Sequence, residues 1–215
     1  MSTSSKSHKV LIVEENLFVR QLMFDLISNL GYECETASDY KEAIKLSSTF
    51  SPDLVITELD FGSKPTGVDL ITTLIKEFPK VQLIALTAYT SPTLIDSKVK
   101  SFPSRVQYIL KNRFTKDTFF KEIIQNALEH KTKSDLHSSK PSDAIFLSET
   151  QAELLKLMAQ GLSNQAIAKK RGTTLRAVEA LVNRTFEALK LNENATTNLR
   201  VEAVKLWNSS KIYLK

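Results

Sequence analysis

The chain is poor in the features that would place it outside the cytoplasm. Cysteine occurs once in 215 residues, at Cys34, so an internal disulfide or a multi-cysteine zinc site cannot form. No stretch approaches the ~18 consecutive apolar residues that a membrane span needs. The polar start MSTSSKSHK also lacks the apolar core of a signal peptide. We therefore expect a cytoplasmic protein without a membrane segment, in which Cys34 is a half-buried thiol or, as the alternative, a redox sensor.

Catalytic motifs are missing as well. The sequence contains no P-loop, no catalytic triad and no cluster of metal ligands, so an enzyme is not expected and no cofactor is assigned. Hydrophobic residues make up 42% and charged residues 25%, which is the balance of a globular protein. The length suits one large domain or two small ones.

The net charge is distributed unevenly along the chain. Residues 1–143 hold 18 basic and 18 acidic residues, whereas residues 144–215 hold 11 basic and 6 acidic residues. The whole net charge of +5 therefore lies in the last third. This asymmetry is typical of a neutral module joined to one that meets a polyanion, although many solvated surfaces are mildly basic.

The first 130 residues alternate between strand-like and helix-like patterns. Apolar residues at helical spacing alternate with short apolar runs, which are typical of strands buried on both faces. This alternation indicates an α/β doubly wound, flavodoxin-like domain with a five-stranded parallel sheet. The predicted strands are 10–13, 32–36, 53–57, 81–86 and 106–110, and the predicted helices are 17–30, 40–46, 68–78 and 115–129.

The rest of the chain divides by composition. Residues 1–8 are expected to form a disordered tail that precedes the α/β domain at 9–130. Residues 131–143 are polar and almost free of large apolar groups, which is typical of a linker. From residue 144 to residue 215 the pattern is helical and gives no strand signal. We therefore predict an all-α four-helix domain at 144–215.

Polar side chains follow the predicted strands of the first domain. Glu14 and Glu15 follow the first strand, Glu58 the third, Thr87 the fourth and Lys111 the fifth. Ligands of doubly wound sheets bind at the carboxyl ends of the strands, where we expect these side chains to meet. Three carboxylates, a hydroxyl and an ammonium suit Mg²⁺ and a phosphoryl group. The alternative is that these are ordinary polar residues at strand ends.

In order and spacing this set resembles a response-regulator receiver domain, over roughly residues 8–130. Receivers carry an acidic pair after the first strand, a phosphoacceptor aspartate after the third, Thr or Ser after the fourth and Lys after the fifth. An aromatic residue precedes that lysine by three positions and moves inward on activation in the family. The residues of this chain at the matching positions are Glu14, Glu15, Glu58, Thr87, Tyr108 and Lys111.

The chain departs from the receiver pattern because all three expected aspartates are glutamates. Each has one more methylene, which adds roughly 1.3–1.5 Å of reach, and in-line phosphoryl transfer tolerates little misplacement. We therefore expect Glu58 to be a poor phosphoacceptor that reaches Thr87 and Lys111 directly and holds an active-like arrangement without phosphate. The alternatives are residual phosphorylation and a dimerisation scaffold without switching. Asn112 replaces the usual proline, so the usual cis peptide bond is not expected there.

The same substitutions weaken the case for bound Mg²⁺. Without a cation, the clustered carboxylates should repel one another. We therefore expect at least one carboxylate pKa to be raised, with Lys111 opposing the rise.

The residue pattern of the last domain predicts short helices separated by turns. Serine and threonine caps begin the helices, and Gly161 and Gly172 stand at the turns. Two short helices and a sharp turn are typical of a helix-turn-helix that binds the major groove. The alternative is an ordinary four-helix bundle that makes protein contacts. The predicted helices begin near Ser148, Ser163, Thr173 or Thr174, and before Val201.

Residues 146–208 resemble the LuxR-type DNA-binding domain. The matching words are Gly-Leu-Ser-Asn-Gln-Ala-Ile-Ala at 161–168 and Arg-Val-Glu-Ala-Val at 200–204, while Ala177 and Leu181 depart from the family. The resemblance implies that helix 174–190 enters the major groove, where Arg and Asn read bases and lysines contact phosphate. The implied DNA-binding residues are Lys169, Lys170, Arg171, Thr174, Arg176, Glu179, Ala180, Asn183, Arg184 and Lys190.

Taken together, the sequence predicts a transcriptional regulator in which a receiver domain is joined to a helix-turn-helix that binds double-stranded DNA. A homodimer is expected, because in this family dimers bind paired half-sites. A protein or a small molecule could act as effector at the receiver domain. The alternatives are a protein-interaction adaptor that does not bind DNA specifically, and a conventional phosphorelay response regulator.

Overall fold

The computed structural model describes residues 7–111, 117–129, 144–191, 198–209 and 211–215. It divides into two compact units. The N-terminal unit comprises residues Met1–Thr87 and Phe102–His137, and the C-terminal unit comprises Ala88–Ser101 and Ser138–Lys215. The predicted linker at 131–143 lies outside the described residues, as does most of the predicted tail. Ser7 and His8 are described, and both hydrogen bond to the start of the second strand or the turn before it.

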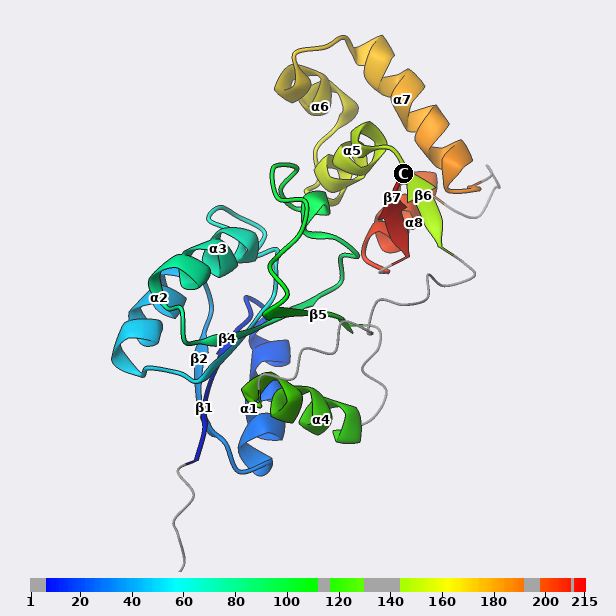
Figure 1. Cartoon of the computed structure of the whole chain (residues 1–215). Coiled ribbons are helices and arrows are strands. Elements are labelled where there is room, and N and C mark those ends of the chain that lie inside the picture. The colour runs from blue at the N-terminus through cyan, green and yellow to red at the C-terminus, as the bar shows by residue number, and fades with distance from the viewer. Residues whose placement is uncertain (1–6, 112–116, 130–143, 192–197, 210) are drawn as a thin grey trace, which may run out of the picture. The chain divides into compact units, whose positions relative to one another are not determined.

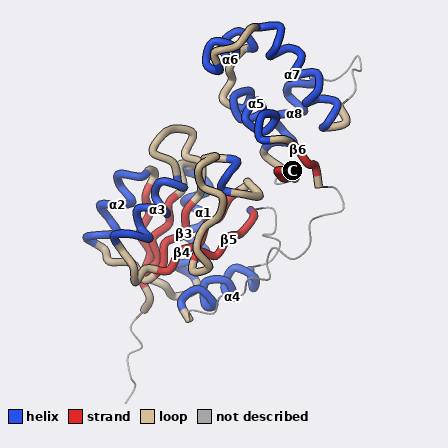
Figure 2. The backbone as a smooth tube through the Cα atoms, turned by 45° about the horizontal axis from the view of Figure 1, so that its top comes forward, coloured by secondary structure: helices blue, strands red, loops and turns tan. Residues whose placement is uncertain are grey.

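The N-terminal unit is built on a parallel five-stranded sheet with the order β2-β1-β3-β4-β5 (Figures 1 and 2). Its inner strands are apolar and buried because helices cover both faces. This confirms the predicted flavodoxin-like fold. The strands are β1 (Lys9–Val13), β2 (Glu33–Ala37), β3 (Leu54–Thr57), β4 (Gln82–Thr87) and β5 (Val106–Leu110).

Four helices flank this sheet: α1 (Leu17–Asn29), α2 (Tyr40–Thr49), α3 (Gly67–Glu77) and α4 (Asp117–Leu128). Alternate side chains of each strand point to opposite faces. One face, which includes Val10 and Ile12, packs against Ile27 of α1 and Ile123 and Ile124 of α4. α2 and α3 lie side by side over the other face (Figure 1). Cys34 of β2 is half-buried, and burial raises the pKa of its thiol, which is unfavourable for a reactive cysteine.

The C-terminal unit contains the four predicted helices, α5 (Glu149–Ala159), α6 (Asn164–Arg171), α7 (Leu175–Ala188) and α8 (Leu199–Trp207). It also contains a two-stranded parallel sheet of β6 (Ile145–Leu147) and β7 (Ile212–Leu214). The prediction that this region has no strand was wrong. Each strand has three residues, which is too short for an alternating pattern to be recognised.

The connection between β4 and β5 holds one short 3-10 helix, η1 (Pro92–Leu94). Residues 88–101 of this connection belong to the C-terminal unit, where Leu94 is part of the core and Tyr89 packs against it. The domain boundaries at 9–130 stay a prediction, although residues 88–101 within them pack with the C-terminal unit. Among the helices of the described residues, none has the length and hydropathy to cross a membrane.

Gly67 provides a test of the packing beneath the strand ends. A Cβ atom at Gly67 would lie 1.8 Å from the carbonyl oxygen of Glu58, whereas one at Gly62 would meet nothing within 4 Å. We predict that Gly67→Ala lowers the free energy of unfolding by about 2–4 kcal/mol. Gly62→Ala should cost about 1 kcal/mol, because φ at Gly62 is +69° and only backbone strain is added. Urea unfolding measures both, and equal losses would contradict the steric explanation.

Candidate functional site

The carboxyl ends of the strands bring together the predicted acidic and basic side chains. The ammonium of Lys111 lies 2.7 Å from Glu14 Oε2 and 2.7 Å from Glu58 Oε2. Both glutamates are buried, with 2% of Glu14 and 6% of Glu58 exposed. A buried carboxylate is costly unless it is paired, so Lys111 is what allows two of them to stay at this edge. We refer to Glu14, Glu15, Glu58, Thr87 and Lys111 as the carboxylate pocket.

Glu58 connects three strands through its carboxylate. One oxygen, Oε1, accepts a hydrogen bond from the backbone N–H of Leu59 at 2.6 Å. The carboxylate also receives a hydrogen bond from the side chain of Thr87 on β4, and its other oxygen pairs with Lys111, which follows β5. The added methylene of glutamate thus reaches both Thr87 and Lys111, as expected from the sequence. In this arrangement the side chain itself spans the distance from β3 to the hydroxyl and the ammonium.

Burial sets the protonation behaviour of the pocket. Burial raises the pKa of Glu58, and the charge and hydrogen bond of Lys111 and the hydrogen bond from Thr87 only partly offset this. For Lys111 burial acts to lower the pKa, but the two glutamates outweigh it and the pKa lies above its usual value. The ammonium therefore stays charged over the physiological pH range, whereas Glu58 holds a proton more tightly than a free carboxyl group does.

Glu15 is a carboxyl group that titrates near neutrality. Desolvation by burial, followed by the charge of Glu14, raises the pKa of Glu15 to about 7. Its side chain still has a solvent-exposed part. Repulsion between carboxylates was the expected cause, but it ranks second to desolvation here.

The residues of the pocket do not form a site for Mg²⁺. Lys111 occupies the space between Glu14 and Glu58, which a hard cation would need to take two of the three carboxylates as ligands. Over the part of the chain that is described, no group of three or more His, Cys, Asp and Glu residues has an arrangement that could hold a metal ion.

Tyr108 is the remaining predicted residue of the receiver domain. Tyr108 is half-buried on β5, where it pairs in register with Ala85, and its ring centroid lies 6.5 Å from that of Phe102. Asn112 lies outside the described residues, so the expectation about its peptide bond is not tested.

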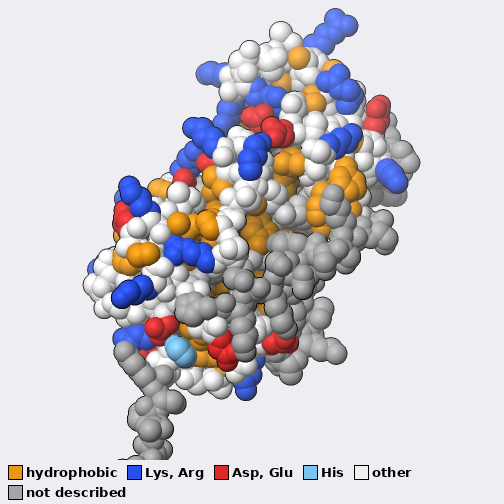
Figure 3. Space-filling view, viewed as in Figure 1, with side chains coloured by type: hydrophobic (Ala, Val, Ile, Leu, Met, Phe, Trp, Pro, Cys, Tyr) orange, Lys and Arg blue, Asp and Glu red, His pale blue; other side chains and the backbone are white. Residues whose placement is uncertain are grey.

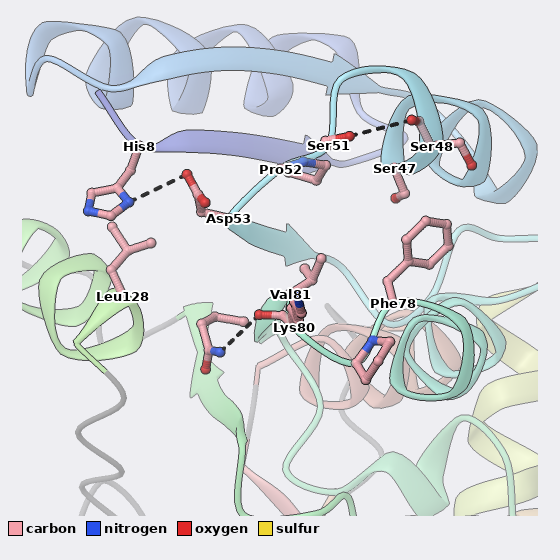
Figure 4. Close-up of a pocket in the computed structure, with 12 residues that line it drawn as sticks. His8, Ser47, Ser48, Ser51, Pro52, Asp53, Phe78, Lys80, Val81 and Leu128 are labelled. Atoms are coloured by element: carbon pink, nitrogen blue, oxygen red, sulfur yellow. Dashed lines mark hydrogen bonds and ion pairs between the residues drawn. The ribbon is translucent and has the colours of Figure 1, made fainter. Parts of the chain in front are cut away.

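A separate groove of about 770 Å³ lies at the opposite, amino-terminal edge of the sheet (Figure 4). His8 and Asp53 face each other across it at 3.4 Å, and both are about half exposed. Ser47, Phe78 and Lys80 also line it. This groove shares no residue with the carboxylate pocket.

The helix-turn-helix of the C-terminal unit is set by local capping. Ser163 accepts a hydrogen bond from Ala166 N and begins α6, and Gly172 ends α6 in the left-handed conformation with φ +62°. Thr174 then accepts from the backbone N–H of Ala177 at 3.2 Å and begins α7. This fixes Thr174, rather than Thr173, as the cap of α7.

The two sides of α7 differ in burial. Val178, Leu181 and Val182 are buried against α5 and α6, which holds the helix in place. The opposite side is exposed and carries the residues that were predicted to face DNA. These are Arg176, Glu179, Ala180, Asn183 and Arg184.

The residues predicted to contact phosphate differ in their exposure and in their ion pairing. Lys169, Lys170 and Lys190 are exposed, and Figure 3 shows Lys and Arg side chains gathered over the surface of the C-terminal unit. Arg171 is half-buried and pairs with Glu153 at 3.1 Å, so much of its charge is already compensated. Sequence reasoning missed Arg200, which donates to Asn164 Oδ1 at 3.0 Å and to the carbonyl of Leu162. Arg200 thereby holds α8 against the start of α6.

Residues 10–124 match the family model of the response regulator receiver domain, which is more than half of the chain. The chain therefore belongs to the response-regulator family, and its C-terminal unit is a LuxR-type helix-turn-helix domain. Full-length similarity to curated regulators agrees with this assignment. The oxygen regulatory protein NreC of Staphylococcus carnosus is 26% identical, over 92% of this chain and 97% of the relative. The transcriptional regulatory protein ComA of Bacillus subtilis is 24% identical, over 95% of this chain and 99% of the relative.

Solved structures share the fold. RcsB from Salmonella enterica serovar Typhimurium, bound to promoter rprA in the presence of a phosphomimetic, aligns with a TM-score of 0.58 and 17% identity, over 94% of this chain and 100% of RcsB. A structure of two RcsB dimers bound to two parallel DNAs aligns with a TM-score of 0.56 and 18% identity, over 95% of this chain and 100% of that chain.

The raised pKa of Glu15 predicts a pH dependence of stability. A carboxyl group with a pKa of about 7 in the folded chain and 4.5 otherwise binds its proton more tightly when folded. Its stabilising effect is therefore complete below pH 4.5 and is lost as the pH rises to about 7. We expect Glu15→Gln to remove this fall, so that thermal unfolding between pH 5 and pH 7 depends less on pH than in the parent chain.

Glu15→Asp is the matched control for that measurement. It keeps a titratable carboxyl at the same place and should keep a fall in stability with rising pH. A Glu15→Gln profile that coincides with the parent profile would contradict the assignment.

Proposed function

We propose that this chain is a transcriptional regulator that binds double-stranded DNA as a homodimer through α7, with a receiver domain that works without phosphorylation. The observation that carries the DNA-binding part is the two-sided character of α7. Its apolar side is fixed in the core, and its other side presents Arg176, Asn183 and Arg184 to solvent. A rigid helix with one free polar side is the form in which a helix-turn-helix enters the major groove.

The exposed residues suit separate tasks in that groove. Arg can donate two hydrogen bonds to guanine and Asn can pair with adenine, so Arg176, Asn183 and Arg184 are suited to read sequence. Lys169, Lys170 and Lys190 lie at the ends of the two helices and form no ion pair with the residues that the structure describes. They suit phosphate contacts, which position the protein. Arg171 contributes less than the sequence suggests, since Glu153 holds it.

The relatives support this proposal. RcsB, which has the same fold, has been captured on promoter DNA and as dimers on DNA, and NreC and ComA are regulatory proteins by name. A dimer would place two copies of α7 on paired half-sites. Because the proposed partner is genomic DNA, we expect the protein to act in the cytoplasm.

The phosphorylation-independent part of the proposal rests on Glu58. In a receiver that uses phosphate, the phosphoryl oxygens are what Thr and Lys bind. Here the Glu58 carboxylate already bonds to Thr87 and Lys111. Control would then come from an effector, a protein or a small molecule, that alters this arrangement rather than from a phosphate donor.

The DNA-binding part is tested by single substitutions on α7. Fragments selected from genomic DNA supply the binding site. Arg184→Ala and Asn183→Ala should each weaken binding to that site by about 1–3 kcal/mol and relax the preference for one base pair. Lys169→Ala should weaken binding to all duplexes alike and reduce the salt slope by about 1.

Lys205→Ala is the control, because it removes an exposed charge that is paired with Glu202 on α8, away from α7. It should leave affinity unchanged. If the parent chain binds every duplex weakly and equally, and Arg184→Ala has no effect, the helical domain is an adaptor and the proposal fails.

The phosphorylation part is tested by shortening the side chain. Glu58→Asp returns the carboxylate to the length that receivers use, so we expect it to accept phosphate from acetyl phosphate in part, while the parent chain accepts none. Intact-mass analysis detects the added phosphoryl group. Glu58→Gln keeps the length without the charge and should not be labelled. Stable labelling of the parent chain would identify a conventional phosphorelay protein instead.

A further inference from the structure

The groove at the amino-terminal edge of the receiver sheet takes no part in the proposed function. Its volume of about 770 Å³ lies within the range of about 300–1,000 Å³ that is typical of sites for small molecules. All of its lining residues belong to the N-terminal unit (Figure 4). Its shape therefore does not depend on how the two units are placed.

Apolar side chains make up much of the lining. Pro52 and Val81, which precede β3 and β4, are buried, and Phe78 and Leu128 are half-buried. Figure 4 shows Val81 between Leu128 on one side and Phe78 on the other. The ring of Phe78 favours an aromatic partner, because two aromatic rings attract each other in offset or edge-to-face contact. The lining thus suits a ligand with an aromatic ring.

Asp53 supplies the groove with a carboxylate that has spare bonding capacity. Its Oδ2 atom accepts a hydrogen bond from the backbone N–H of Lys9 at 2.9 Å and lies 3.4 Å from His8 Nδ1. Its Oδ1 atom has no hydrogen-bond donor among the residues that the structure describes. Since both oxygens of a carboxylate accept hydrogen bonds, Asp53 can bind the ammonium of a ligand as well.

Lys80 brings a positive charge to the same part of the groove. The backbone N–H of Gln82 donates to the carbonyl of Asp53 at 2.9 Å, so the residues just before β4 lie beside Asp53. The side chain of Gln82 donates to the carbonyl of Lys80 at 3.3 Å, which helps to fix this turn. Within the described ranges, the ammonium of Lys80 forms no ion pair. The groove therefore offers a carboxylate and an ammonium next to an apolar lining.

We infer that this groove is a binding site for a free aromatic amino acid. The α-ammonium of the ligand pairs with Asp53, its α-carboxylate pairs with Lys80, and its ring packs on Val81 and Phe78. A ligand with only one of the two charges leaves either Asp53 or Lys80 unused. The inference goes beyond the proposed function and does not use it, because binding is measured without DNA.

A series of ligands tests the inference on the parent chain. L-phenylalanine is the probe, and we expect it to bind with a Kd of about 1 mM or tighter. The amide NMR signals of Val81 and Gln82 should shift in a saturable way. 2-Phenylethylamine lacks the carboxylate and 3-phenylpropionate lacks the ammonium, so each should bind about fivefold more weakly, a modest factor because ion pairs open to solvent are screened. L-alanine keeps both charges but lacks the ring, and should bind about tenfold more weakly.

Two groove variants assign the charges to their partners. Asp53→Asn should weaken binding of L-phenylalanine about fivefold and should not weaken binding of 3-phenylpropionate. Lys80→Gln should weaken binding of L-phenylalanine to a similar extent and should not weaken binding of 2-phenylethylamine. Asp25→Asn on α1 and Lys121→Gln on α4 are the matched controls, because they change the same charges on exposed residues outside the groove. Both controls should bind as the parent chain does.

The absence of saturable binding of L-phenylalanine to the parent chain would overturn the inference. Equal binding of L-phenylalanine and both analogues would refute it as well, because the site would then recognise only the ring. If only one groove variant weakens binding, the ligand carries a single charge and is not an amino acid. The ligand series decides even where a groove variant fails to fold, which circular dichroism detects. None of these results bears on DNA selection by α7, and loss of DNA binding would leave the binding of L-phenylalanine unchanged.

Discussion

The shared pairing of Lys111 with Glu14 and Glu58 is the interaction on which the functional account depends. Two carboxylates that are almost fully buried meet one ammonium, at 2.7 Å from each. Breaking a buried pair by removing one partner typically costs about 3–5 kcal/mol, because the remaining charge stays uncompensated. The ends of β1, β3 and β5 are thereby held at one edge of the sheet. Glu58 adds β4 to this set through Thr87.

That pairing also shows how glutamate and aspartate at position 58 differ in their reach towards Thr87 and Lys111. A shorter carboxylate would leave a space between itself and the Thr87 and Lys111 side chains, and phosphate fills such a space in receivers. In this structure the longer side chain of Glu58 reaches both of these groups. The protonation of Glu15 remains variable near neutral pH, because its pKa is raised to about 7.

The sequence predicted the sheet and the pocket because both follow from short-range rules. Apolar runs located the strands, and parallel topology brought their ends together. The capping residues Ser148, Ser163 and Thr174 located three helices to within a residue or two. The strands β6 and β7 escaped prediction because three-residue strands carry no period, and their pairing joins residues 67 positions apart, such as Ile145 and Ile212.

Two features of the site depended on contacts that the sequence does not encode locally. Tyr89, Leu94 and Ile95 are apolar residues without helical or strand spacing, so nothing in their pattern indicated which core they would enter. The pairing of Arg171 with Glu153 joins α6 to α5, and it reduces a charge that sequence reasoning had assigned to DNA phosphate. The buried and exposed sides of α7 could be predicted from the sequence, because the helical spacing of its apolar residues separates the two sides directly.

The most direct test of the central claim compares the affinity of the parent chain for its selected DNA site before and after treatment with acetyl phosphate and Mg²⁺. The account predicts full, sequence-selective binding in the untreated protein and no change on treatment, because Glu58 already occupies the place of the phosphoryl group. Weak binding that becomes tight only after treatment would contradict it.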